Sequence, residues 1–208
     1  MTDPWTELEN EIRSCTRCPL HLSRRNAVPG EGPRDAKIMF VGEAPGATED
    51  ELGRPFVGAA GRLLTMTMEA VGIRRSEVYI TNVVKCRPPN NREPRDEEIK
   101  ACSPFLERQI ELLRPRIVVT LGNVAGKWFF ERSGLKWPGV TKARGKTYHV
   151  KVCGVELILI PTIHPAAALY NPSMRTLLQE DLRRVKEVME AGTSETKPKT
   201  LLDFVKRS

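Results

Sequence analysis

Residues 36–58 have the sequence AKIMFVGEAPGATEDELGRPFVG, and this stretch decides the fold. It opens with a short continuous apolar run, Ile38 to Val41, of the kind that is buried inside a parallel sheet. The run ends at the turn Gly42-Glu43-Ala44-Pro45-Gly46, which places a carboxylate just past the carboxyl end of the strand. Open α/β sheets bind their ligands at that edge. Glu43 is therefore the first candidate for a catalytic residue.

Apolar runs and helical patterns alternate along the rest of the chain. Strands are predicted at 36–41, 78–84 and 116–121, and a hairpin is predicted at 146–152 and 155–160. Helices are predicted at 4–14, 59–71, 94–113, 123–132 and 173–190. Pro104 is expected to kink or divide the helix at 94–113. The alternation predicts an α/β fold in which helices cover both faces of a parallel sheet.

Length and composition favour a single cytoplasmic domain. A chain of 208 residues is long enough for one well-buried core. No apolar run approaches the roughly 20 residues that span a bilayer, and the polar start MTDPWTELENEIRSC does not resemble a signal peptide. The net charge of +7 suits a polyanionic partner, although a basic solvated surface has the same charge. Glutamine is rare beside many Lys, Arg and Glu, which favours a thermophilic source.

Four cysteines form two groups that could share one metal centre. Cys15 and Cys18 have Cys-x-x-Cys spacing, and Cys86 and Cys102 follow later in the chain. Structural disulfides are disfavoured in a cytoplasmic protein. Four thiolates can hold either zinc or an iron–sulfur cluster, and the spacing does not choose between them. A redox-active or merely buried set of thiols is the alternative, and Cys153 is expected to be an ordinary core cysteine.

Polar side chains collect at the predicted strand ends. Glu43 follows the first strand, Asn82 lies within TNVVKC, and His164 follows the apolar run of ILIPTIHPAA. Each has a simpler explanation: an exposed glutamate, an asparagine that satisfies a turn, and a histidine that caps the next helix. Phe56, in the loop GRPFVG, is either a stacking platform for a planar ligand or a hydrophobic plug. Convergence on one edge of one sheet favours a shared site.

These motifs together resemble the family 4 uracil-DNA glycosylases, an iron–sulfur class found in archaea and many bacteria. The resemblance covers about residues 10–190 and is carried by the cysteine spacing and by GEAPG at 42–46, GRPFVG at 53–58, TNVVKCRPPNNREP at 81–94 and HPAA at 164–167. It implies a three-layer α/β/α sandwich around a four-stranded, mostly parallel sheet. It also implies that a structural [4Fe–4S] cluster is held by Cys15, Cys18, Cys86 and Cys102.

The activity implied by the resemblance is hydrolysis of the bond between uracil and deoxyribose in single- and double-stranded DNA, by a monomer that initiates base excision repair. The flipped base needs a tight pocket. There Phe56 would stack on the uracil ring, and the Asn82 amide would pair with O4 and N3–H and reject cytosine. His164 and the backbone N–H groups of the Gly42–Glu43 turn would stabilise the negative charge of the departing uracil. Glu43 would position the attacking water.

Two segments depart from the pattern of the wider family. After the His-Pro pair, Ala166 replaces a serine and Tyr170 replaces an arginine, which leaves Leu169 as the candidate wedge into the DNA. The stretch RPPNNREP lacks the arginine-rich insertion of the DNA-crosslinking branch, so ordinary turnover is expected.

The C-terminal end differs in composition from the rest. We expect residues 1–192 to form the glycosylase domain and residues 193–208 to form a flexible tail. Within the tail, residues 198–205 (PKTLLDFV) resemble a sliding-clamp-binding peptide, with Phe204 and Val205 in place of the aromatic pair. The alternative is a frayed amphipathic end.

Two rival functions remain open at this point. The same fold could excise hypoxanthine, xanthine or thymine, because pocket contacts decide the base. A non-catalytic iron–sulfur or zinc module that binds nucleic acid would also fit the charge and the cysteines. It would leave Glu43, Phe56, Asn82 and His164 unexplained.

Overall fold

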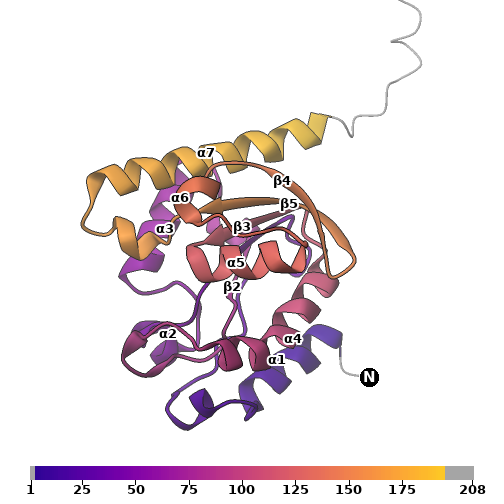
Figure 1. Cartoon of the computed structure of the whole chain (residues 1–208), viewed down its shortest axis with the longest axis vertical. Coiled ribbons are helices and arrows are strands. Elements are labelled where there is room, and N and C mark those ends of the chain that lie inside the picture. The colour runs from indigo at the N-terminus through magenta and orange to yellow at the C-terminus, as the bar shows by residue number, and fades with distance from the viewer. Residues whose placement is uncertain (1–2, 195–208) are drawn as a thin grey trace, which may run out of the picture.

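The computed structural model describes residues 3–194, which form one five-stranded sheet with helices on both faces (Figure 1). The strands are β1 (Ile38–Gly42), β2 (Tyr79–Asn82), β3 (Ile117–Leu121), β4 (Tyr148–Val152) and β5 (Val155–Thr162). The α-helices are α1 (Pro4–Ser14), α2 (Ala47–Leu52), α3 (Ala59–Ala70), α4 (Asp96–Leu113), α5 (Asn123–Arg132), α6 (Val140–Ala143) and α7 (Pro172–Ser194). Short 3-10 helices are η1 (Pro19–Leu22), η2 (Arg75–Glu77), η3 (Pro89–Asn91) and η4 (Pro165–Ala168).

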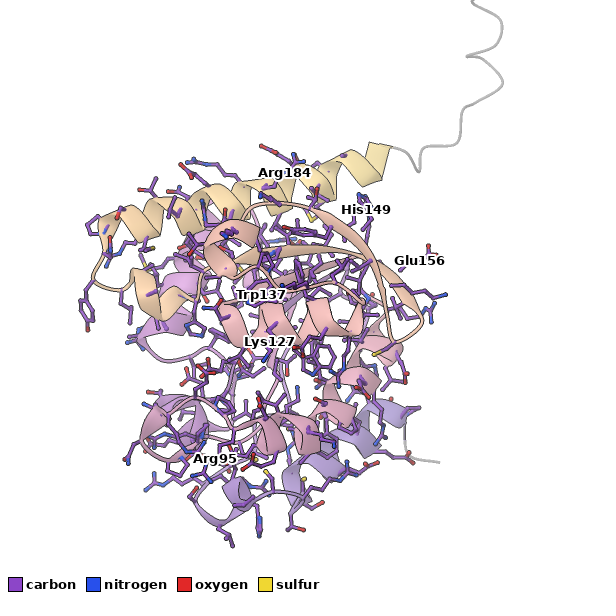
Figure 2. All side chains as sticks on the ribbon, viewed as in Figure 1. Arg95, Lys127, Trp137, His149, Glu156 and Arg184 are labelled. Atoms are coloured by element: carbon purple, nitrogen blue, oxygen red, sulfur yellow. The ribbon has the colours of Figure 1, made fainter. Side chains whose placement is uncertain are left out.

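The sheet contains one strand more than the predicted four. Its order is β2-β1-β3-β5-β4, and the first four strands pair in parallel. β4 pairs antiparallel with β5 from Tyr148↔Leu159 to Val152↔Val155. The predicted hairpin thus supplies both the last parallel strand and an extra edge strand. His149 and Glu156 project outward from this hairpin, as suits a solvent-exposed edge (Figure 2).

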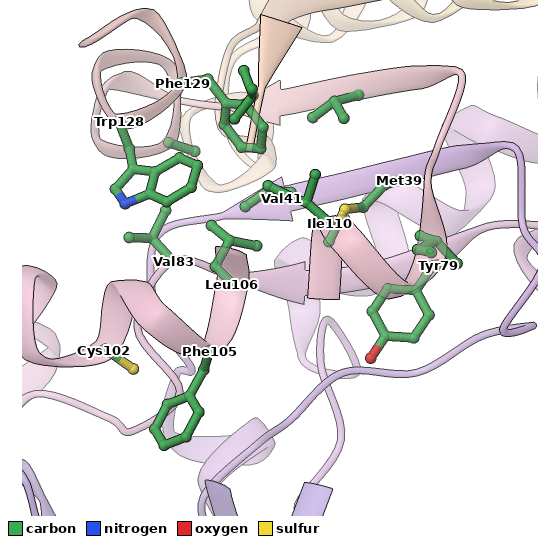
Figure 3. Close-up of a cluster of buried hydrophobic side chains, with 14 of the residues drawn as sticks. Met39, Val41, Tyr79, Val83, Cys102, Phe105, Leu106, Ile110, Trp128 and Phe129 are labelled. Atoms are coloured by element: carbon green, nitrogen blue, oxygen red, sulfur yellow. The ribbon is translucent and has the colours of Figure 1, made fainter. Parts of the chain in front are cut away.

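Two apolar clusters cover the two faces of the sheet. Alternate residues of β1 face opposite ways, with Met39 in one cluster and Phe40 in the other. The first cluster joins the sheet to α1, α4 and α5, and Figure 3 shows part of it, including Leu106 and Trp128. The second joins the sheet to α3 and α7, for example through Leu182. The three-layer α/β/α sandwich is thereby confirmed.

Helix α4 begins later than predicted and is not divided. Its start at Asp96 follows a capping interaction in which the Glu98 carboxylate accepts the Arg95 backbone N–H at 2.8 Å. Pro104 lies inside the helix, which continues to Leu113 because the following turns are buried in the core. Strand β2 likewise ends at Asn82 rather than at residue 84. Within residues 3–194, no helix combines the length and apolarity needed to cross a membrane.

Candidate active site

A cavity of about 440 Å³ opens beyond the carboxyl ends of β1, β2 and β5. Glu43, Phe56, Asn82 and His164 all line it. The convergence follows from topology, because β1 and β2 are parallel neighbours whose last residues, Gly42 and Asn82, are paired in register. The volume lies in the range of small-ligand pockets. The structure therefore brings together the three side chains predicted at strand ends, Glu43, Asn82 and His164, and adds Phe56 from the GRPFVG loop.

Asn82 lies at the end of β2 with only 1% of its surface exposed. Its side-chain oxygen Oδ1 is buried and has no hydrogen-bond partner among the described residues. A buried amide oxygen left unpaired is costly, so it suits a ligand that brings an N–H donor. The neighbouring Gly42 leaves the necessary space: a Cβ there would lie 2.5 Å from Asn82 Oδ1 and 2.5 Å from Phe56 Cζ.

The loop that carries Phe56 is held in place from three sides. Arg75 donates from Nη1 to the Phe56 carbonyl at 2.9 Å, and Glu49 Oε1 accepts the Gly58 backbone N–H at 2.7 Å. Gly61 lies so close that an added Cβ would approach the Phe56 carbonyl carbon to 2.0 Å. Phe56 itself has a φ of 49°, a left-handed conformation that a bulky residue adopts only when its surroundings enforce it. The ring is thereby presented to the cavity in one fixed place.

His164 follows β5 and begins η4, with its ring centroid 5.8 Å from that of Phe56. Its Nδ1 accepts the Ala166 backbone N–H at 3.1 Å, so the capping role considered from the sequence is present. Burial of the ring lowers the pKa of His164 to about 4. A neutral imidazole that accepts at Nδ1 carries its proton on Nε2. His164 is thus a neutral hydrogen-bond donor at neutral pH.

Glu43 is half-buried at the mouth of the turn after β1. Burial, together with the nearby charge of Glu93, raises the pKa of its carboxyl group above the ordinary value of 4.5. The backbone carbonyls of Gly42 and Glu43 accept from Val83 and Val84 at 2.9 and 3.0 Å. These bonds hold the backbone of the turn against the segment that follows Asn82.

Sequence patterns did not reveal several residues that shape the cavity. Glu49 and Arg75 act on the Phe56 loop from α2 and η2, and Arg92 lines the cavity from the loop before α4. Arg92 is paired with Glu98, at 2.7 Å. Charged residues at these places have no periodic signal. Only the proximity of GRPFVG to GEAPG along the chain pointed to that region.

The four cysteines predicted as metal ligands line a second cavity, next to the segment that follows β2. Its lining includes Cys15, Cys18, Cys86 and Cys102. Within residues 3–194 no group of three or more His, Cys, Asp or Glu side chains could hold a single metal ion. Four thiols that line one space are a donor set that either a zinc ion or an iron–sulfur cluster uses.

Hydrogen bonds to the sulfurs also suit thiolates. Arg24 Nη1 donates to Cys86 Sγ at 3.0 Å, and the Lys85 backbone N–H donates to Cys102 Sγ at 3.3 Å. Burial raises the pKa of Cys102 to about 12, so this thiol is protonated at neutral pH, and a metal centre bound here would displace the proton. All five cysteines are free, and Cys153 lies apart from this cavity in the β4–β5 turn.

The fold and the first cavity define an α/β domain with a pocket of small-ligand size at the carboxyl edge of its parallel sheet. The sequence profile of the Uracil DNA glycosylase superfamily matches residues 29–187. Over 187 residues the chain is 54% identical to a Type-4 uracil-DNA glycosylase of Sulfurisphaera tokodaii, covering 89% of this chain and 85% of that protein. It is 50% identical to the Type-4 enzyme of Saccharolobus solfataricus, with 95% and 90% covered.

A Type-4 uracil-DNA glycosylase of Thermotoga maritima is 46% identical, with 88% of this chain and 93% of that protein covered. The chain therefore belongs to the uracil-DNA glycosylase superfamily and, within it, to the type-4 family. The resemblance drawn from the sequence motifs is confirmed.

Proposed function

We propose that this chain is a uracil-DNA glycosylase that hydrolyses the bond between uracil N1 and deoxyribose C1′ in DNA and so initiates base excision repair. The observation that carries the proposal is the unpaired Asn82 Oδ1, which faces a cavity that Phe56 and His164 also line. The target base must be flipped out of the helix to reach such a recessed site. Single- and double-stranded DNA can both deliver a flipped base.

Recognition of uracil is assigned to Phe56 and Asn82. Phe56 stacks on the ring, and its constrained loop keeps this surface in place. Asn82 Oδ1 accepts the uracil N3–H, and its amide nitrogen donates to O4. Cytosine presents an acceptor and a donor in the opposite positions, so a fixed amide leaves both groups mismatched.

Bond cleavage is assigned to His164, Glu43 and the turn after β1. As the N1–C1′ bond breaks, negative charge accumulates on uracil, largely at O2. The Nε2–H of neutral His164 and the backbone N–H groups of the Gly42–Glu43 turn donate to that oxygen, an interaction worth about 10²–10³ in rate for one donor. Glu43 orients the water that attacks C1′, and its carboxylate offsets the positive charge that develops on the sugar.

The cysteine cavity is proposed to hold a [4Fe–4S] cluster through Cys15, Cys18, Cys86 and Cys102. The cluster would tie the segment after α1 to α4 and to the loop after β2, and no catalytic step requires it. We propose a structural role for the metal centre on this ground. The monomeric state, the domain boundary at residue 192, the cytoplasmic location and the thermophilic source remain predictions.

The 3-10 helix η4 borders the cavity and is proposed to face the DNA. Tyr170 is 95% exposed, and Ala166 lines the cavity. Arg175 Nε donates to the Ala168 carbonyl at 2.9 Å, and its Nη2 donates to the Leu169 carbonyl, so the loop is fastened to α7. Leu169 and the exposed Tyr170 are the candidates that fill the gap left by the flipped base.

A labelled oligonucleotide with one uracil tests the function directly. Wild-type protein should generate an alkali-labile site at the uracil, in both the single strand and the duplex. A variant carrying both Glu43→Ala and His164→Ala should not, while keeping the wild-type circular dichroism spectrum. Cleavage by that variant would contradict the proposed site. Iron-loaded wild-type protein that does not cleave at uracil would favour a non-catalytic module that binds nucleic acid.

Gly42→Ala should lower uracil excision by about 10²-fold or more, because its methyl group must displace Phe56 or Asn82. Single-turnover rates measure this effect. Gly154→Ala in the β4–β5 turn is the control, since its Cβ would meet no described atom within 4 Å and Gly154 does not line the cavity. Equal losses in the two variants would contradict the close-packing argument.

The pH dependence of the rate should show no inflection near 6.5. His164 remains neutral down to a pKa of about 4, whereas Glu43 loses its charge as pH falls through its raised pKa. The rate should therefore fall at acid pH as the Glu43 carboxylate becomes protonated. In Glu43→Gln the fall in rate at acid pH should be absent. Single-turnover rates between pH 4 and 8 test this, with the exposed His149→Ala as control. An inflection near 6.5 that disappears in His164→Asn would contradict it.

Residues 198–205 lie outside the described residues, and we propose that they bind a sliding clamp. Deleting residues 198–208 should abolish clamp capture in a pull-down and leave excision on a free oligonucleotide unchanged. Undiminished clamp capture by the truncated protein would rule this out.

A further inference from the structure

A buried polar network around the Lys85 side chain adjoins Asn82. The backbone N–H of Lys85 bonds Cys102 at the cysteine cavity, whereas its side chain has no role assigned above. Lys85 is 1% exposed, and its Nζ donates to Thr81 Oγ1 at 2.7 Å, to the Asn82 backbone carbonyl at 2.6 Å and to Gln109 Oε1 at 2.6 Å. An ammonium group has three N–H donors, and all three are used here. No carboxylate in residues 3–194 is within ion-pair distance of Lys85.

The network joins three segments that are distant in sequence. The Thr81 hydroxyl donates to the Pro29 carbonyl at 2.7 Å, and Gln109 Nε2 donates to the same carbonyl at 2.8 Å. Gln109 belongs to α4, Thr81 belongs to β2, and Pro29 precedes β1. The side chains of Thr81 and Gln109 are fully buried. The Lys85 ammonium therefore anchors the end of β2 to α4, and the Thr81 hydroxyl ties the same strand to the chain before β1.

A buried cation is a poor way to gain stability. Removing an ammonium group from water is costly, and an apolar residue of similar volume would often stabilise a core more. The network instead fixes the orientation of the groups it bonds, because each hydrogen bond restricts the position of its acceptor. One of the groups it restricts is the peptide carbonyl of Asn82, and the side-chain oxygen of the same residue has no partner among the described residues to orient it.

We propose that Lys85 is a positioning residue for base recognition: by holding the Asn82 backbone at the end of β2, it aims the Asn82 amide at the base. This inference rests on the proposed function. It predicts that Lys85 affects uracil binding only through Asn82. Loss of Lys85 would let the end of β2 shift, and displacement of a positioning group by about 1 Å can cost on the order of 10² in rate.

A double-mutant cycle of Lys85→Met with Asn82→Ala tests the proposal. Methionine keeps the buried chain and removes the three donors. In the wild-type background, Lys85→Met should lower kcat/KM for uracil excision by about 10-fold to 10²-fold and weaken inhibition by free uracil by a similar factor. In the Asn82→Ala background it should cost less than about twofold, because residues acting through one contact are not additive.

Other readouts separate positioning from simple stabilisation. Iron content per folded chain should be unchanged in Lys85→Met, and rates are compared below the thermal transition. Ser103→Ala is the matched control, since it removes another buried hydrogen bond of α4, from Trp128 Nε1 at 2.8 Å, and should leave uracil inhibition unchanged. If Lys85→Met does not fold, Gln109→Met is the second variant, because it removes one of the three acceptors. It should lower kcat/KM by a smaller factor than Lys85→Met, and this loss should also disappear in the Asn82→Ala background.

Equal losses from Lys85→Met in both backgrounds would overturn the assignment of Lys85, as would full uracil affinity in the folded single variant. Full activity of Asn82→Ala would instead overturn the role of Asn82 in the proposed function, and the inference would fail with it. The two failures are distinguished by the Asn82→Ala variant alone.

Discussion

Asn82→Asp should lower the single-turnover rate of uracil excision by about 10²–10³-fold. An ionised carboxylate accepts hydrogen bonds but cannot donate one to uracil O4, and its charge repels that oxygen. Any residual activity should shift toward cytosine, whose exocyclic amine is a donor. The measurement is excision from matched oligonucleotides that carry one uracil or one cytosine at the same place.

The control for this prediction is the same chemical change elsewhere. Asn123 Oδ1 accepts the Val140 backbone N–H at 3.0 Å, and Asn123 does not line the active-site cavity. Asn123→Asp should therefore excise uracil at close to the wild-type rate. Unchanged uracil excision by Asn82→Asp, in protein with the wild-type melting temperature, would exclude Asn82 from base recognition.

Cys86→Ala should cause the largest loss of stability among the variants considered. Removing one of four thiolates should release the iron, and a metal centre that binds only the folded state contributes its binding free energy to folding. We expect the free energy of unfolding to fall by about 3 kcal/mol or more, which lowers the melting temperature by roughly 10 °C in a chain of this size. Iron analysis, visible absorbance and thermal melting together measure the effect.

Cys153→Ala provides the comparison for the cysteine prediction. Cys153 is half-buried and lies in the β4–β5 turn, away from the cysteine cavity. This variant should keep its iron and its visible absorbance. A colourless Cys86→Ala protein that melts with the wild type would contradict a structural cluster, and so would equal iron loss in the two variants.

The chain order of the elements was predictable because the hydrophobic pattern is local. The continuous apolar run of β1 and the Pro4 start of α1 both carry signals within a few residues, and both elements were found where expected. Element ends were less predictable. Strand β2 stops at Asn82 because Val83 and Val84 turn to bond the carbonyls of Gly42 and Glu43, a contact between segments some forty residues apart.

The membership of the site was also predictable, because parallel strands bring their carboxyl ends to one edge of the sheet. That rule places Glu43, Asn82 and His164 together from the sequence alone. What it could not provide was their protonation and orientation. The low pKa of His164 and the Nε2 proton follow from burial and from the Ala166 backbone N–H, neither of which has a sequence signal.

The layers, the family and four side chains of the cavity, Glu43, Phe56, Asn82 and His164, could be predicted from the sequence, since each follows from residue type and spacing along the chain. The tertiary structure decided the five-stranded sheet, the arrangement of the four thiols around one space, and the supports of the site: Glu49, Arg75, Lys85 and Gln109. The position and role of a buried polar side chain depend on the groups to which it is hydrogen-bonded. Those partners come from segments that only the folded chain brings within hydrogen-bond distance.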